Sequence, residues 1–395
     1  MLDFGKCGGY NFPAMKRHFL SRKDILAALL VLALTGALAL GAVSGRNVSG
    51  NPEGEDEGGE EKTPEIEYTI GVVNGKSGSD DLIQGFSDAL TDQFGEWAFV
   101  LNRTDTEGDA ARNAAAVTND LKAGSDLIFA IGDSALSTSA TLAKDLPVVG
   151  ADVMDFQTVL GIGGSDWDGK TGTNVTGISS LPDMEAVLSL LIEATPDLST
   201  VGLLYTEGDT NALLQNHLLE AYMDEAGIAW KEYALPLSVD PEAAAAAEAA
   251  GTPLPTLESM TALAATECSV LFLPGNSALS ASAATISQIA LSLGKPLVAA
   301  DRTAGQSALV CAYDNPYVQG YYAGELAVRI LRDGYYPGDL EVLPSGTPIH
   351  KLYSRSYADI LGMTFPKSFT EYSEFFTSYD MSSDIDRAKE TEKLQ

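Results

Sequence analysis

Four groups of small polar residues in this sequence have the composition of ligand-binding loops. Each group directly follows an apolar run and leads into a helical pattern. An open α/β sheet of parallel strands binds ligands where the carboxyl ends of its strands meet, so we expect these groups to lie at a binding site. The candidate residues in them are Asn74, Ser77, Asp133, Ser134, Glu207, Asn211, Asn276 and Ser277.

Three acidic residues and one aromatic residue at other strand ends complete the set of candidates. Asp152, Asp301 and Asp314 each follow an apolar run, and Tyr313 ends the run VCAY. Carboxylates accept hydrogen bonds from cationic groups. An acid at a strand end is also often a solvated loop residue or a helix cap. Capping stays open for Asp314, because Pro316 and a long helical pattern follow it.

The sequence contains no motif of a common catalytic or cofactor site. No GxGxxG begins a βα turn, and there is no P-loop and no GxSxG elbow. The three cysteines and three histidines are isolated, so no spacing suggests zinc. The sequence therefore predicts a non-enzymatic binding protein without cofactor or metal.

The elements that position these candidates form two successive α/β series. The first series has predicted strands near 68–73, 97–101, 126–131, 147–150 and 174–178, with helices near 80–93, 108–123 and 135–144. The second has helices near 182–194, 210–226, 256–266 and 278–293, with strands near 200–205, 229–234, 269–273 and 296–300. A strand near 307–313, a helix near 318–331 and a strand near 347–353 follow. A chain of 395 residues is expected to form two lobes rather than one core.

The amino-terminal part has the composition of an export segment followed by a tether. Residues 1–24 are basic and are expected in the cytoplasm, and residues 25–45 form a predicted signal or anchor helix. Residues 46–65, rich in Gly and Glu, are a predicted disordered acidic linker. The remainder is then extracytoplasmic, either membrane-anchored by the uncharged run 25–43 or secreted after cleavage. The net charge of −31 excludes nucleic acid and anionic lipid as favoured partners.

Motifs that occur in order over about 66–366 resemble those of a known family. They include GDAARNAAAVTNDLKAGSDLIFAIG, LPVVGADVMD, VGLLYTEGDTNALLQ, LFLPGNSAL and ALVCAYDNPYVQGYYAGELAVRIL. With this order, the chain resembles the ABC transporter substrate-binding proteins of the tryptophan/tyrosine type, a branch with the type I periplasmic-binding-protein fold. It departs from the family in having no lipidation cysteine after the apolar run. The Ala-rich insert 240–255 and the tail 367–395, to which we assign no role, have no obvious counterpart either.

The resemblance implies an α/β fold of two Rossmann-like lobes joined by three crossovers. Lobe 1 would comprise 66–178 plus 303–335, and lobe 2 would comprise 179–302 plus 336–366. The lobes would close on a small molecule. The resemblance favours an amino acid, and an aromatic amino acid is one option. The protein would deliver it to an ABC permease in the membrane. The alternative is an extracellular ligand-sensing module tethered by its N-terminal helix, and a neighbouring permease and ATPase would favour transport.

An amino-acid ligand, as the resemblance suggests, assigns roles to the candidates. Helix N-termini at Ser77, Ser134 and Asn276 would supply N–H donors to its carboxylate. Each of them is equally compatible with an ordinary helix cap. The ammonium would contact Asp301 or Asp314.

Further candidates have competing structural roles. Glu207 is the next acid for the ammonium, and the amide of Asn211 can donate and accept at once, or form an Asx turn. Tyr313 would line an aromatic wall or simply belong to the core. Asp301 followed by Arg302 would alternatively form an ion pair between the lobes, acting as a latch.

Overall fold

The computed structural model describes residues 66–163, 167–345 and 349–386. The predicted basic segment, signal or anchor helix and acidic linker, all within 1–65, lie outside the described residues. Among the residues that are described, none of the helices combines the length and apolar character needed to cross a bilayer.

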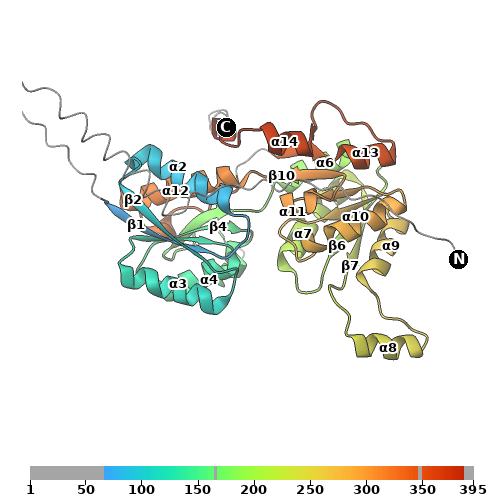
Figure 1. Ribbon diagram of the computed structural model, residues 1–395, viewed down its shortest axis with the longest axis horizontal. Coiled ribbons are helices and arrows are strands. Elements are labelled where there is room, and N and C mark those ends of the chain that lie inside the picture. Colours follow the sequence, from blue (N-terminus) through green and yellow to red (C-terminus); the bar gives the residue numbers. More distant parts are fainter. Residues whose placement is uncertain (1–65, 164–166, 346–348, 387–395) are drawn as a thin grey trace, which may run out of the picture. The chain divides into compact units, whose positions relative to one another are not determined.

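The first half of the fold is a parallel five-stranded sheet, which we call the five-stranded lobe together with its helices. Its strands are β1 (Tyr68–Asn74), β2 (Phe99–Asp105), β3 (Leu127–Ile131), β4 (Val148–Val153) and β5 (Val175–Ser179). Their order is β2-β1-β3-β4-β5. The helices are α2 (Asp80–Phe94), α3 (Ala110–Ala123), α4 (Asp133–Leu142), α5 (Phe156–Leu160) and α12 (Pro316–Leu331). Helices α2 and α12 cover one face of the sheet, and α3 and α4 cover the other (Figure 1).

Helices α2 and α12 approach each other so closely that their contact requires glycine. A Cβ at Gly320 would lie 1.9 Å from the carbonyl oxygen of Leu82, and one at Gly85 would lie 2.0 Å from the carbonyl oxygen of Tyr317. Both obstacles are backbone atoms, which no side-chain rotation can move. Helix α12 is thereby fixed on the five-stranded lobe although it follows a strand of the other sheet.

The second half is a seven-stranded sheet, which we call the seven-stranded lobe together with its helices. Its strands are β6 (Thr200–Tyr205), β7 (Ala229–Ala234), β8 (Val270–Leu273), β9 (Leu297–Ala299), β10 (Val310–Tyr313), β11 (His350–Tyr353) and β12 (Thr370–Glu371). Their order is β12-β11-β10-β9-β8-β6-β7, and only the β10–β11 pair is antiparallel. The stretch β7-β6-β8-β9-β10 repeats the strand order of the five-stranded sheet.

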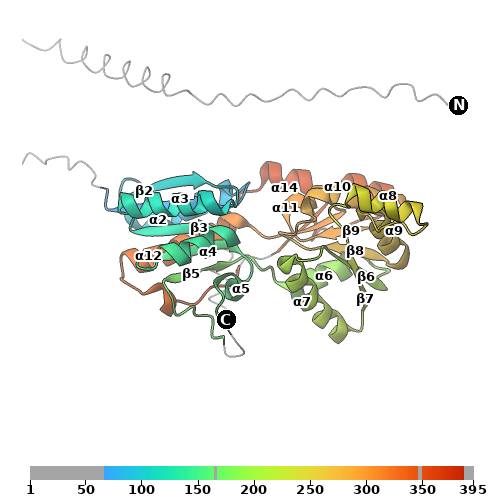
Figure 2. The same cartoon turned by 90° about the horizontal axis from the view of Figure 1, so that it is seen from below.

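Helices cover both faces of the seven-stranded sheet as well. Helices α6 (Met184–Ala194) and α7 (Thr210–Ala226) pack on one face, and α9 (Leu257–Glu267) and α10 (Ala283–Ser292) pack on the other (Figure 2). The remaining helices are α8 (Pro241–Ala249), η1 (Ser280–Ser282), α11 (Arg302–Gly305), η2 (Pro337–Asp339), α13 (Arg355–Leu361) and α14 (Tyr372–Ser378). Helix α8 lies in the predicted Ala-rich insert and buries none of its residues.

The predicted class, an α/β fold with two parallel sheets, is confirmed, and every predicted strand is present within a few residues. Among the described residues, three crossings connect strands or helices of one lobe to those of the other before β12: after β5, between β10 and α12, and between Leu343 and β11. The lobe boundaries as a whole stay a prediction.

Strand pairing nevertheless differs from the predicted boundaries at two segments. β10 belongs to the seven-stranded sheet, although 303–335 was assigned to lobe 1, because Val310 pairs in parallel with Val298 of β9. Leu343 bridges Ile178 of β5, although 336–366 was assigned to lobe 2. The second crossing therefore follows β10 rather than preceding it, and the third comes after Leu343.

Candidate functional site

A cleft of about 710 Å³ lies where the carboxyl ends of strands from both sheets meet. This volume is in the range of sites that enclose small molecules. Five strand-end segments supply most of its lining: 76–82 after β1, Asp152 and Met154 at β4, 275–277 after β8, 300–303 after β9, and Tyr313 with Asp314 at β10. The predicted residues among them are Ser77, Asp152, Asn276, Ser277, Asp301, Tyr313 and Asp314.

The N-terminus of α2 opens into this cleft without a side-chain cap. Ser79 is the N-cap residue, but its side chain makes no capping hydrogen bond. The carboxylates of the first turn are held by arginines: Asp80 contacts Arg103 at 2.7 Å and Asp81 contacts Arg302 at 3.1 Å. A helix N-terminus with free N–H groups is suited to bind a carboxylate.

Asp152 and Asn276 meet across the cleft from opposite lobes. The Nδ2 of Asn276 donates to Oδ1 of Asp152 at 2.8 Å. Both residues have left-handed backbones, with φ of 51° and 50°, a conformation that is uncommon outside glycine and that recurs at binding sites. Burial raises the pKa of Asp152, and the nearby charge of Lys76 and the Asn276 bond oppose this rise.

Asp301 organises the loop on the seven-stranded side of the cleft. Its Oδ1 accepts from the N–H of Ala304 at 2.6 Å, so Asp301 caps the short helix α11. Its Oδ2 accepts from the N–H of Asn276 at 3.0 Å and from the hydroxyl of Ser280 at 2.8 Å. The capping alternative is thus correct for Asp301, and the same side chain also faces the cleft.

Arg302 forms an ion pair with Asp81 of the other lobe. Asp301 takes no part in this pair. The two side chains are 46% and 44% exposed, so the pair contributes little to stability. The guanidinium of Arg302 also lies over the ring of Phe376, 4.3 Å from its centre.

Asp314 and Tyr313 lie where the chain leaves the seven-stranded sheet. Asp314 does not cap α12, because Asn315 occupies the N-cap position and accepts from the N–H of Tyr317. Burial raises the pKa of Asp314 to about 6, although Gln319 donates to its Oδ2. Tyr313 is 2% exposed, so it is both a core residue and part of the cleft wall.

The other predicted residues lie outside the cleft lining. Asn74 is buried in its own lobe, where its Nδ2 donates to Asp105 at 2.7 Å. The hydroxyl of Ser134 donates to the carbonyl of Gly108 and accepts from Asn113 at 2.8 Å. Both side chains therefore stabilise loops inside the five-stranded lobe.

Three more predicted residues lie at the rims of the two lobes. Asn211 donates to Asp133 across the lobes at 3.4 Å, and burial raises the pKa of that carboxyl. Glu207 is exposed in a turn. The bond between Asn211 and Asp133 joins the rims of the two lobes, but neither residue lines the cleft.

Several residues of the cleft were missed by sequence reasoning. Lys76, Gln306 and Gln319 line it with long polar side chains. Lys76 is the second residue after β1, in NGKSGSD, and this position was a usable signal. Gln319 lies on α12 and Gln306 in the turn after α11, where polar residues are too common to single out. In the described part of the chain, no group of three or more His, Cys, Asp or Glu side chains is arranged to hold a metal ion.

Comparisons with known proteins agree with the two-lobed geometry. A family model described as ABC transporter substrate binding protein matches residues 69–347. The Tyrosine-binding protein of Clostridioides difficile (strain R20291) is 24% identical over 218 residues, which are 55% of this chain and 57% of that protein. This match therefore spans little more than half of the relative's length.

This chain aligns with nearly the full length of two solved structures that have the same fold. A ligand-free, open substrate-binding protein with adhesive properties from Clostridium difficile is 23% identical and has a TM-score of 0.62, covering 77% of this chain and 99% of its own. An ABC domain in complex with L-Trp from Streptococcus pneumoniae is 22% identical with a TM-score of 0.61, covering 76% and 96%. These similarities confirm the type I periplasmic-binding-protein fold.

Proposed function

The chain belongs to the ABC transporter substrate-binding protein family, and we propose that it captures a free amino acid between its two lobes for import. The family consists of binding proteins rather than enzymes, and it implies a small-molecule ligand and an ABC permease. Family members of this kind act outside the cytoplasm. The amino-acid ligand and the import step are our proposals.

One observation carries the choice of an amino acid: the cleft presents a site for each charge of a zwitterion. The uncapped N-terminus of α2 suits the carboxylate. Asp152 and Asp301 line the same cleft and suit the ammonium. The arginines that hold Asp80 and Asp81 reduce the repulsion that those two acids would exert on a bound carboxylate.

The remaining space supports a large side chain on the ligand. Tyr313 and Met154 contribute aromatic and sulfur-containing surface to the lining. A tyrosine-binding relative and a neighbouring structure that holds L-Trp agree with an aromatic amino acid. We therefore propose tyrosine and tryptophan as the first ligands to test.

A thermal-shift screen with the twenty common amino acids tests this proposal on protein beginning at Thr63. A ligand that binds only the folded state stabilises it by mass action, by about 2.7 kcal/mol at a hundredfold excess over Kd. The melting temperature rises as a result. We expect one or a few amino acids, aromatic ones among them, to raise it. No shift with any amino acid would contradict the ligand assignment.

The import step needs a separate measurement in cells. A strain that lacks this gene should take up the stabilising amino acid more slowly than its parent, and the plasmid-borne gene should restore uptake. Unchanged uptake in the deletion strain would contradict the role in import and favour a tethered sensor.

A further inference from the structure

The carboxy-terminal segment begins its path on the seven-stranded lobe. It follows the region matched by the family model, which ends at residue 347. β12 pairs with β11, and α14 then carries Phe375 into an apolar cluster with Tyr313 and Leu352. This segment is therefore anchored in the core of the lobe that contains β10 and β11.

The same segment ends in the core of the other lobe. Ile385 is 7% exposed and belongs to the apolar core of the five-stranded lobe, together with Val318 and Tyr322 of α12. Between Phe375 and Ile385 the chain thus passes from one lobe to the other. It forms a fourth passage, in addition to the three crossovers.

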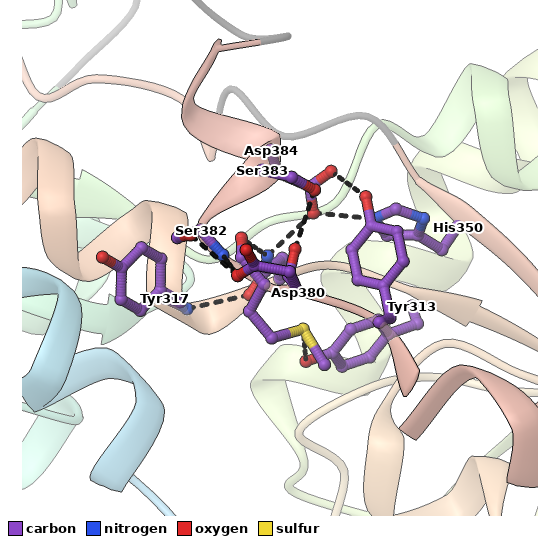
Figure 3. A network of polar contacts seen from close by, with 10 residues as sticks. Tyr313, Tyr317, His350, Asp380, Ser382, Ser383 and Asp384 are labelled. Carbon is purple, nitrogen blue, oxygen red and sulfur yellow. Dashed lines mark hydrogen bonds and ion pairs between the residues drawn. The ribbon is translucent and has the colours of Figure 1, made fainter. Parts of the chain in front are cut away.

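A buried carboxylate joins this passage to two of the crossovers. Asp384 is fully buried, and it accepts from Nδ2 of Asn315 at 2.8 Å and from the hydroxyl of Tyr379 at 2.5 Å. Its Oδ2 also lies 2.8 Å from Nε2 of His350 (Figure 3). Asn315 lies in the crossing between β10 and α12, and His350 begins β11 directly after the third crossing.

The network is matched to a charged carboxylate. Burial, the largest single influence, acts to raise the pKa of Asp384, but the bonds from His350, Tyr379 and Asn315 together hold that pKa below its usual range. Hydrogen bonds to an ionised group are about twice as strong as neutral ones. Breaking one of these contacts leaves a buried polar or charged group without its partner. Separating the segment from the crossovers therefore costs free energy.

The segment also supports two residues of the cleft. The hydroxyl of Tyr372 donates to the carbonyl of Arg302 at 3.0 Å, and the ring of Phe376 packs edge-on to that of Tyr313 at 5.0 Å. A movement of the segment would therefore displace Arg302 and Tyr313 in the cleft wall.

We propose that residues 372–385 form a strap that ties the two lobes at their hinge and limits their relative rotation. Hinge closure requires changes of backbone angle in the few residues that connect the lobes. The strap adds a buried link beside those residues, anchored by Phe375 on one side and by Ile385 on the other. Asp384 fastens it to two of the three connections.

Distances between spin labels on the two lobes test the strap without any ligand. The labels are placed on Lys122→Cys of α3 and Thr266→Cys of α9, both exposed, in the full chain carrying Cys7→Ser. Cys268 and Cys311 are buried, so we expect the label to leave them unmodified. Pulsed electron paramagnetic resonance then gives the distribution of distances between the lobes.

We expect Asp384→Asn to widen this distribution by about twofold or more, because the fastening to Asn315 and His350 is weakened. The matched control is Asp386→Asn, whose side chain is exposed, and it should leave the width unchanged. A lower melting temperature with an unchanged width would overturn the proposal, since the network would then only support the local structure.

A second variant keeps the test decisive if Asp384→Asn does not fold. Ile385→Ala removes the anchor in the five-stranded lobe and leaves the polar network intact. We expect it to widen the distribution as well, and a width equal to that of the parent protein would overturn the strap.

Discussion

The two lobes share one strand order, yet some polar residues at their strand ends have different partners. In the five-stranded lobe, Asn74 and Ser134 bond to their own lobe and support its loops. In the seven-stranded lobe, Asn276 and Asp301 line the cleft, and Asn276 reaches Asp152 on the opposite side. The same sequence pattern therefore produces residues that stabilise a loop within one lobe and residues that line the cleft.

The difference comes from the partners that each lobe offers. Ser134 lies beside Asn113 of α3 and the carbonyl of Gly108, which together satisfy its hydroxyl. The left-handed backbone of Asn276 is compatible with its side chain bonding to the other lobe. The side chain of Asn276 therefore reaches the other lobe, whereas that of Ser134 is held within its own.

The largest effect is expected for Asp301→Ala on binding of the amino acid that stabilises the protein. The change removes a cleft carboxylate, its two bonds to Asn276 and Ser280, and the cap of α11. Asp301 is half-buried, and loss of a hydrogen-bonded charge in a binding site costs about 2 kcal/mol or more, so we expect an affinity at least about thirtyfold lower by calorimetry. Asp240→Ala, in the insert, is the control, and equal small effects would remove Asp301 from the site.

Gly320→Ala should cause the next largest effect, and on folding rather than on binding. The new methyl would overlap the backbone of Leu82 in α2, so the helices must separate. Overpacking costs about 1 to 3 kcal/mol, and a backbone obstacle favours the upper end. Urea unfolding measures the loss, and a midpoint unchanged from the parent protein would contradict the close helix contact.

Asp120→Asn tests a buried charge that has no counterpart in the seven-stranded lobe. The Asp120 carboxyl packs on Gly71 of β1, whereas the corresponding Gly202 of β6 meets the apolar side chains of Leu271 and Cys268. Burial raises the pKa of Asp120 from 3.8 to about 6. Between these values the native state binds more protons than the unfolded chain, so stability falls as the pH rises through that window.

The asparagine variant should lose this part of the pH dependence. We expect it to be more stable than the parent protein by about 2 kcal/mol at pH 7, with the difference disappearing toward pH 4. Chemical denaturation at several pH values measures it. A difference that stays constant with pH would show that the carboxyl is not buried in a protonated form.

Ser134→Ala should have the smallest effect and sharpens the comparison most. It leaves Nδ2 of Asn113 without the hydroxyl oxygen that accepts its hydrogen bond, so we expect a loss of about 1 kcal/mol in the free energy of unfolding. The affinity for the amino acid should stay within about twofold of the parent protein. A tenfold loss of affinity would place Ser134 in the site and erase the difference between the lobes.

The fold and part of the cleft could be predicted from the sequence for local reasons. Apolar runs ending in small polar residues predicted the strands and placed Asp152 and Asn276 at the site. Lys76 and Gln319 were missed because long side chains reach the cleft from positions without a distinctive pattern. The strap was missed because Asp384 acquires its role from His350 and Asn315, which are distant in sequence.

A crystal structure with the amino acid that gives the largest thermal shift tests the central claim most directly. We predict a ligand in the cleft, with its carboxylate at the N-terminus of α2 in the five-stranded lobe and its ammonium near Asp152 and Asp301. The ligand would thus contact both lobes at once. A ligand bound to one lobe alone, or outside this cleft, would contradict the account.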